Sequence, residues 1–101
     1  PAEDAVEMAT AGGARALGFD AGRIEAGANA DIAVVDFDAP HLTPTHDYVS
    51  HLAYAVRGSD VRHTVCDGRV LMRDREVLTL DADAIRARAA NRAAALAERA
   101  E

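Results

Sequence analysis

The sequence predicts an α+β fold in which a small β-sheet is flanked by an N-terminal and a C-terminal helix. Small and apolar residues recur at helical spacing over residues 2–17 and again from residue 81 to the end. Between them lie a continuous apolar run at 32–35 and two alternating runs around an Asp-Gly pair at 67–68. The chain has 101 residues, so it holds one domain at most and no complete (β/α)8 barrel, which needs about 200.

The first helix is expected over residues 2–17. Pro1 suits a helix start, and Glu3 and Asp4 complement the positive end of the helix dipole. Two adjacent glycines, Gly12-Gly13, weaken a helix by about 1 kcal/mol each, so they suggest that another element approaches this face closely. Gly18 is expected to end the helix in the left-handed conformation.

Residues 31–37 are predicted to form a strand after the turn-rich stretch 22–27. The run Ile32–Val35 is apolar throughout, which indicates burial on both faces. A loop with two prolines follows at 38–45. A short helix is then expected over 47–56, with Asp47 as its N-cap.

The second half of the chain opens with a hairpin signal. Asp67-Gly68 separates the alternating runs 61–66 and 69–73, which predicts a two-residue turn with positive φ at both positions. Asp74-Arg75 is a second expected turn, and residues 76–80 are expected to be a third strand or an extended arm.

A terminal helix is predicted from Asp81 onward. Asp81 can cap it and Asp83 favours its first turn. Its apolar residues trace a weak stripe at Ile85, Ala89, Leu96 and Ala100.

Alanine and arginine dominate the composition, with 24 alanines, 11 arginines and no lysine. Alanine buries little apolar area, so we expect a thin core. The net charge of −6 argues against a nucleic-acid or anionic-membrane partner. The single Cys66 excludes an intramolecular disulfide and suits a reducing, cytoplasmic location. Its apolar surroundings predict a buried thiol rather than a reactive nucleophile.

Three histidines invite a metal-site hypothesis: His41, His46 and His51, with Asp47 beside them. Helical zinc ligands stand at i and i+4, whereas a five-residue step leaves successive side chains about 140° apart. Pro44 also interrupts the segment. Packing or capping is therefore the favoured role for these histidines, with metal ligation through the loop as the alternative.

The remaining polar candidates also favour structural roles. Asp31 and Asp36 bracket the strand about 16 Å apart, too far for an acid–base carboxylate pair, and are expected to end the strand and cap turns. His63 is expected to be a sheet histidine rather than a catalytic base. Arg57-Gly58-Ser59-Asp60 is expected to be a turn. Gly22 and Gly27 lack the G-K-[ST] ending of a phosphate loop, and Ser50 and Ser59 lack a nucleophile-elbow context.

Two stretches resemble the C-terminal part of the amidohydrolase superfamily, the metal-dependent hydrolases built on a (β/α)8 barrel. They are ATAGGARALG at 9–18 and GRIEAGANADIAVVD at 22–36. The segment APHLTPTHDYVSHL at 39–52 is similar to the branch of S-adenosylhomocysteine/methylthioadenosine deaminases and triazine chlorohydrolases.

The resemblance implies that residues 1–18 are the helix at the end of the barrel domain. Residues 19–101 would be the C-terminal portion of a composite β-sandwich plus the terminal helix. The parent enzyme would use a divalent metal, zinc or iron, to hydrolyse a C–N or C–Cl bond on a purine-like or triazine ring. The family's HxH pair, two further histidines and aspartate match no positions here. No catalytic, cofactor-binding or metal-binding residue is therefore assigned to this chain.

Two functions remain open from the sequence. One is a piece of a deaminase or chlorohydrolase, inactive in isolation, whose partner is the missing N-terminal barrel. The other is a non-catalytic assembly or interaction module. Either way, an unpaired strand edge and a small-residue helix face predict a homo-oligomer, built by edge pairing, helix packing or exchange of the terminal helix.

Overall fold

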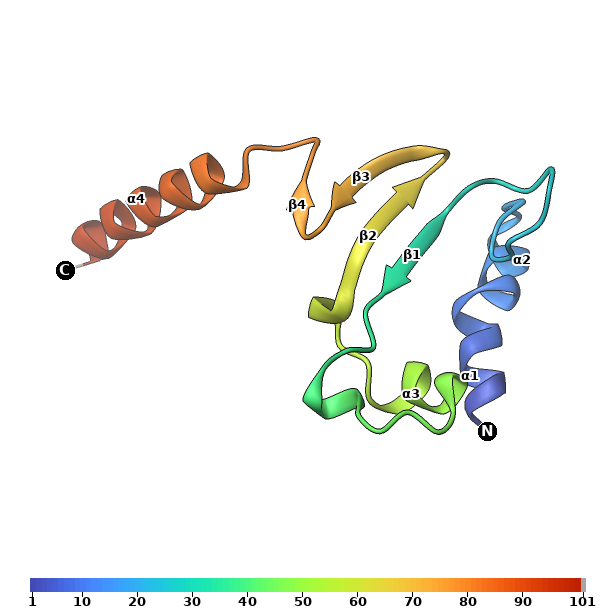
Figure 1. Cartoon of the computed structure of the whole chain (residues 1–101). Helices are drawn as coiled ribbons and strands as arrows, with labels where there is room; N and C mark the ends of the chain where they lie inside the picture. Colours follow the sequence, from blue (N-terminus) through green and yellow to red (C-terminus); the bar gives the residue numbers. More distant parts are fainter. Residues whose placement is uncertain (101) are drawn as a thin grey trace.

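The computed structural model describes residues 1–100 (Figure 1). The four strands of these residues form one antiparallel sheet in the order β1-β2-β3-β4. The predicted α+β class is confirmed, and these 100 residues contain no barrel. The elements are α1 (Ala2–Ala9), α2 (Ala11–Leu17), β1 (Ile32–Val35), η1 (Pro40–Leu42), α3 (Tyr48–Tyr54), η2 (Gly58–Asp60), β2 (Val61–Cys66), β3 (Arg69–Arg73), β4 (Glu76–Val77) and α4 (Ala82–Ala100).

The N-terminal segment is two helices rather than the single one predicted. Thr10, with φ −120° and ψ −101°, separates α1 from α2. A Cβ on Gly12 would lie 3.0 Å from the Glu7 carbonyl oxygen, and one on Gly13 would lie 2.8 Å from that of Met8. The glycines are therefore required where α2 turns against the end of α1. The close backbone approach expected at these glycines is confirmed, and it comes from the end of α1.

Gly18 ends α2 in the left-handed conformation, as predicted, with φ 76°. The following loop then folds back onto the helix break. Gly22 has φ 84°, and a Cβ there would lie 2.5 Å from the Thr10 carbonyl oxygen. Only glycine permits this approach, so the loop and the α1–α2 break are positioned together.

Strand β1 is shorter and less covered than the sequence predicts. It spans four residues and pairs with β2 on one side only, at the edge of the sheet. Val34 is 44% exposed. The apolar run indicated burial on both faces, and this was wrong because α1 and α3 pack on each other rather than on the strand.

The two predicted turns of the hairpin are confirmed. Asp67 and Gly68, with φ of 50° and 77°, connect β2 to β3. Asp74 and Arg75, with φ of 47° and 69°, connect β3 to the two-residue strand β4. The remainder of the predicted third strand, residues 78–80, bends toward α4 instead of continuing the strand.

Helix α3 begins as predicted at Asp47. Its Oδ1 accepts hydrogen bonds from the backbone N–H groups of Val49 (3.0 Å) and Ser50 (3.2 Å). The ring of Tyr48 meets that of Phe37 edge-on, with 5.0 Å between centroids. This contact fixes the first turn of α3 beside the chain that leaves β1.

The core is thin, as the alanine content predicts. Leu42 is the one fully buried hydrophobic side chain in the described part of the chain. Helix α4 is exposed along its length and extends away from the sheet (Figure 1). None of the helices within residues 1–100 has the length and apolar character needed to cross a bilayer.

The hairpin turn gives a first prediction. In Gly68→Val the new Cβ meets no atom within 4 Å, so the expected cost arises chiefly from the positive φ. We expect a loss of about 1–2 kcal/mol in unfolding free energy, measured by urea denaturation.

Gly58→Val is the matched control, because Gly58 also has open space around it and no positive φ. Equal stability losses in the two variants would contradict the assigned turn geometry.

Candidate functional site

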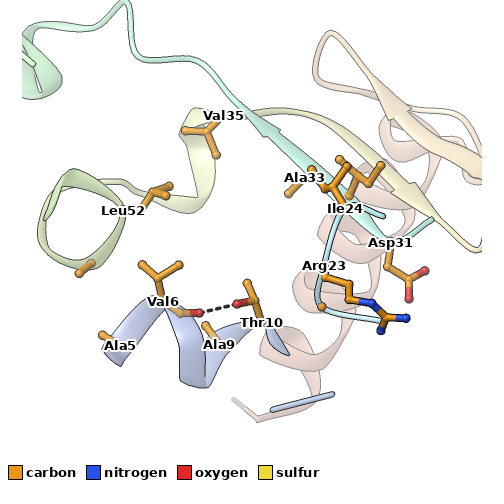
Figure 2. A pocket seen from close by; sticks show the side chains of 13 residues that line it. Ala5, Val6, Ala9, Thr10, Arg23, Ile24, Asp31, Ala33, Val35 and Leu52 are labelled. Carbon is orange, nitrogen blue, oxygen red and sulfur yellow. Dashed lines mark hydrogen bonds between the residues drawn. The ribbon is translucent and has the colours of Figure 1, made fainter. Parts of the chain in front are cut away.

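The main concavity is a groove of about 590 Å³ between α1, the loop at 22–24, β1 and α3 (Figure 2). Most of its lining is apolar, and Ile24 is 88% exposed beside it. The lining residues are Ala5, Val6, Ala9, Thr10, Gly22, Arg23, Ile24, Asp31, Ile32, Ala33, Val35, Leu52 and Ala53. A groove of this chemistry offers a packing surface rather than a set of reacting groups.

Its two charged residues, Arg23 and Asp31, lie together at one end (Figure 2). Arg23 donates to Glu25 (2.6 Å) and to Asp20 (2.7 Å), and these hydrogen bonds raise its pKa. Asp31 accepts a hydrogen bond from the backbone N–H of Asp67 at 2.7 Å. Both side chains are therefore engaged in holding loops.

The three histidines of the H-x4-H-x4-H pattern do not converge. His41 Nε2 lies 2.8 Å from Asp60 Oδ2, and His51 Nε2 donates to the Leu42 carbonyl oxygen at 3.1 Å. His46 is exposed. Across residues 1–100, no three histidine, cysteine or acidic side chains are grouped so as to hold a metal ion. The structure thus gives two of these histidines the packing and capping roles favoured from the sequence.

Asp60 is the most strongly held carboxylate of the loop region. Its Oδ2 accepts from His41 and, at 2.7 Å, from the backbone N–H of Arg57, and its side chain is only 8% exposed. The hydrogen bond from His41, followed by that from Arg57, lowers the pKa of Asp60. This confirms that residues 57–60 form a structural turn.

Asp36 ends β1 as predicted and also joins an ion network. One of its oxygens accepts from the Asp38 N–H (2.8 Å), and the other pairs with Arg62 (2.9 Å). Arg62 also donates to Asp74 at 3.2 Å, and the Asp74 and Asp36 contacts raise the pKa of Arg62. This network was not among the predicted features. In a regular two-residue turn at 67–68, Arg62 would pair with Arg73, and it is the bulge between Thr64 and Val65 that shifts the register toward Asp74.

His63 and Cys66 lie on β2. His63 Nδ1 accepts a hydrogen bond from the Asp74 N–H at 3.0 Å, so it is the structural sheet histidine that was predicted. Cys66 is exposed, which contradicts the predicted buried thiol. It is the last residue of β2, beside the turn, where no helix covers the sheet.

Comparison with known proteins identifies the protein family to which this chain belongs. A family model described as "Amidohydrolase family" matches residues 1–71. This match spans more than half of the chain, and the chain belongs to the amidohydrolase family. The resemblance inferred from residues 9–18 and 22–36 is confirmed.

Individual relatives narrow the similarity to deaminases and chlorohydrolases. The chain is 76% identical over 100 residues to the 5-methylthioadenosine/S-adenosylhomocysteine deaminase of Halobacterium salinarum, covering 99% of this chain and 23% of that protein. It is 49% identical over 81 residues to the 5'-deoxyadenosine deaminase of Methanosarcina mazei, covering 80% and 19%. The chain therefore spans about a quarter or less of these relatives' length.

Solved structures show similarity to the same two kinds of enzyme, a deaminase and a chlorohydrolase. The fold is similar to an adenosine deaminase from Xanthomonas campestris with bound zinc, with a TM-score of 0.83 at 35% identity, over 90% of this chain and 21% of that one. It is also similar to the atrazine chlorohydrolase of Arthrobacter aurescens complexed with zinc, with a TM-score of 0.76 at 31% identity, over 86% and 19%. Hence this small sheet and its helices occur within larger zinc-containing proteins.

The hydrogen bonds that Asp60 accepts from His41 and Arg57 give a second prediction. Asp60→Asn removes a carboxylate whose pKa is held below its ordinary value of 3.8, so the melting temperature should fall by several degrees at about pH 7. The stabilisation is complete above the ordinary pKa and is lost as pH falls through the lowered one. The difference from the unaltered chain should therefore vanish in strong acid.

Asp38→Asn is the control of equal charge change, because the Asp38 carboxylate is exposed and makes no ion pair within residues 1–100. If both variants lower the melting temperature equally, net charge rather than the Asp60 contacts is responsible.

Proposed function

We propose that this chain is the C-terminal portion of a metal-dependent hydrolase that removes an amino group from a purine-like ring. The observation that carries the proposal is the 76% identity, over 99% of the chain, to a 5-methylthioadenosine/S-adenosylhomocysteine deaminase. The chlorohydrolase similarity is weaker, at 31% identity, so cleavage of a C–Cl bond on a triazine ring is the less supported chemistry.

Within that protein we assign residues 1–18 to the helical end of the barrel domain and residues 19–101 to the small sheet domain with its terminal helix. The exposed apolar side chains of the first segment support this, since Met8 is 71% and Leu17 73% exposed. The edge strand β1 and the groove beside it support it as well. Such surfaces are stable in water when another part of the protein covers them.

We place the catalytic metal, zinc or iron, in the part of the parent protein outside this chain. The histidines and carboxylates of residues 1–100 form no group that fits a metal ion, because each of the best candidates is engaged elsewhere. When bound in the parent, the metal would activate a water for attack on the ring carbon. This chain's residues support that site only by completing the fold. The single cysteine favours a cytoplasmic location.

A second function, a non-catalytic assembly module, is favoured by one observation. The chief concavity of the described chain is an apolar groove without a reacting group free to act. The two functions predict different results for a polypeptide that is extended upstream of Pro1. The hydrolase proposal predicts that it has deaminase activity, and the assembly-module proposal predicts that it has none.

The third prediction is that the 101-residue chain, purified without a tag, neither deaminates methylthioadenosine nor retains stoichiometric zinc. Elemental analysis and the absorbance change of adenine deamination measure the two quantities. A polypeptide extended upstream by the region homologous to the relatives' remaining length should do both.

Zinc bound to the short chain and lost on replacing His46 or His51 would contradict the placement of the metal. An extended polypeptide without either property would instead favour the assembly module.

A further inference from the structure

Helix α4 lacks any substantial packing contact within the described chain. It is 19 residues long and exposed throughout. Successive helical residues turn by about 100°, which gathers its apolar residues into one stripe. The stripe consists of Ile85, Ala89, Ala93, Leu96 and Ala100. Ile85 is 39% and Leu96 63% exposed. Helices of this length owe most of their stability to tertiary packing of such a face.

Arginines define one edge of this stripe. Arg88, Arg92 and Arg99 follow it on the same side, at i, i+4 and i+11. The two carboxylates, Asp83 and Glu98, lie on the opposite side of the helix, where Asp83 pairs with Arg86. The face that carries Ile85 and Leu96 is therefore bordered by positive charge only.

The rest of the chain has the complementary charge. Residues 82–100 carry four arginines and two carboxylates, a net charge of +2. Residues 1–81 carry seven arginines and fourteen carboxylates, a net charge of −7. An apolar stripe with a basic edge therefore finds a complementary surface on the acidic part of a chain like its own.

The position of α4 favours a second molecule over its own. The helix leaves the β4 end of the sheet and extends away from α1 and α2, which lie across the sheet at the other side (Figure 1). Its packing against other elements of its own chain is too slight to bury the stripe.

We propose that α4 is an intersubunit arm whose stripe and arginine edge dock on the acidic part, residues 1–81, of a second copy of this chain. Pairing of α4 with α4 is disfavoured, because two antiparallel helices with their stripes in contact bring the two arginine edges together. An exchanged arm buries Ile85 and Leu96 in both copies and pairs the arginines with carboxylates. The proposal does not depend on the hydrolase activity of the parent.

The test is the mass of the 101-residue chain by sedimentation equilibrium, with reductant present so that the exposed Cys66 stays reduced. We expect a dimer or a larger oligomer of the 10.6 kDa chain at micromolar concentration. The double variant Arg88→Glu/Arg92→Glu should raise the dissociation constant on the order of ten-fold or more. Leu96→Asp should do the same through the stripe.

Matched controls make the test specific to this face. Ala84→Glu/Ala87→Glu/Asn91→Glu/Ala94→Glu changes the net charge equally but lies on the side of α4 opposite the stripe. Ala94→Asp introduces the same side chain as Leu96→Asp on the far side of α4. Both should associate as the unaltered chain does, and circular dichroism should show unchanged helix content in all four variants. A monomeric unaltered chain, or equal effects of variants and controls, overturns the proposal.

Cross-linking distinguishes docking on the body from pairing of two arms. In a Cys66→Ser background, Ala93→Cys places one thiol at the centre of the stripe. Oxidation of the associated protein should leave this thiol unlinked, because after Cys66→Ser the proposed docking surface, residues 1–81 of the second copy, contains no cysteine. A disulfide-linked dimer that forms in high yield would show that α4 packs on α4 and would overturn the proposed docking.

Discussion

The pairing of β1 with β2 joins the two halves of this molecule, and an aspartate anchors it at each end. At one end, Asp31 accepts from the Asp67 N–H while the Gly68 N–H donates to the Ala30 carbonyl. At the other, the Asp36 N–H donates to the Asp60 carbonyl and its carboxylate pairs with Arg62. The register between these anchors changes once, at Val34/Val35. The α1–α3 contact therefore keeps its place relative to the hairpin mainly because the strand ends are fixed.

The polar anchors matter because apolar burial contributes so little. With Leu42 as the single fully buried hydrophobic side chain among residues 1–100, the helices and the sheet enclose a groove instead of a shared core. Marginal stability in proteins is a small difference between large terms, and a domain with few buried contacts opens locally at low cost. The small number of buried apolar side chains also bears on the function of the chain. Under the proposed function, the rest of the larger protein covers these apolar surfaces, in keeping with a segment that spans 23% of a related deaminase.

Features determined by a few adjacent residues could be predicted from the sequence. The Asp47 cap, the Gly18 helix end and the two turns at 67–68 and 74–75 each depend on local backbone chemistry. Features that depend on distant neighbours could not. The apolar run of β1 predicts burial, but whether both faces are covered depends on which elements pack there. Cys66 was misassigned for the same reason, and the break at Thr10 depends on the approach of Gly22 from the next loop. The candidate site followed this rule: the structural roles of Asp36, Asp47 and His63 could be predicted, whereas the Arg62 network and the groove arise from tertiary assembly.

The central claim is that this chain completes a larger hydrolase and carries none of its reacting groups. The most direct measurement is the coding sequence upstream of Pro1. The account predicts a continuous reading frame that supplies most of the protein, as the 23% share of the related deaminase implies, with an HxH pair early in a barrel sequence. A stop codon followed by a start codon immediately before Pro1 would contradict it, and would make the fold described here a complete protein with a function of its own.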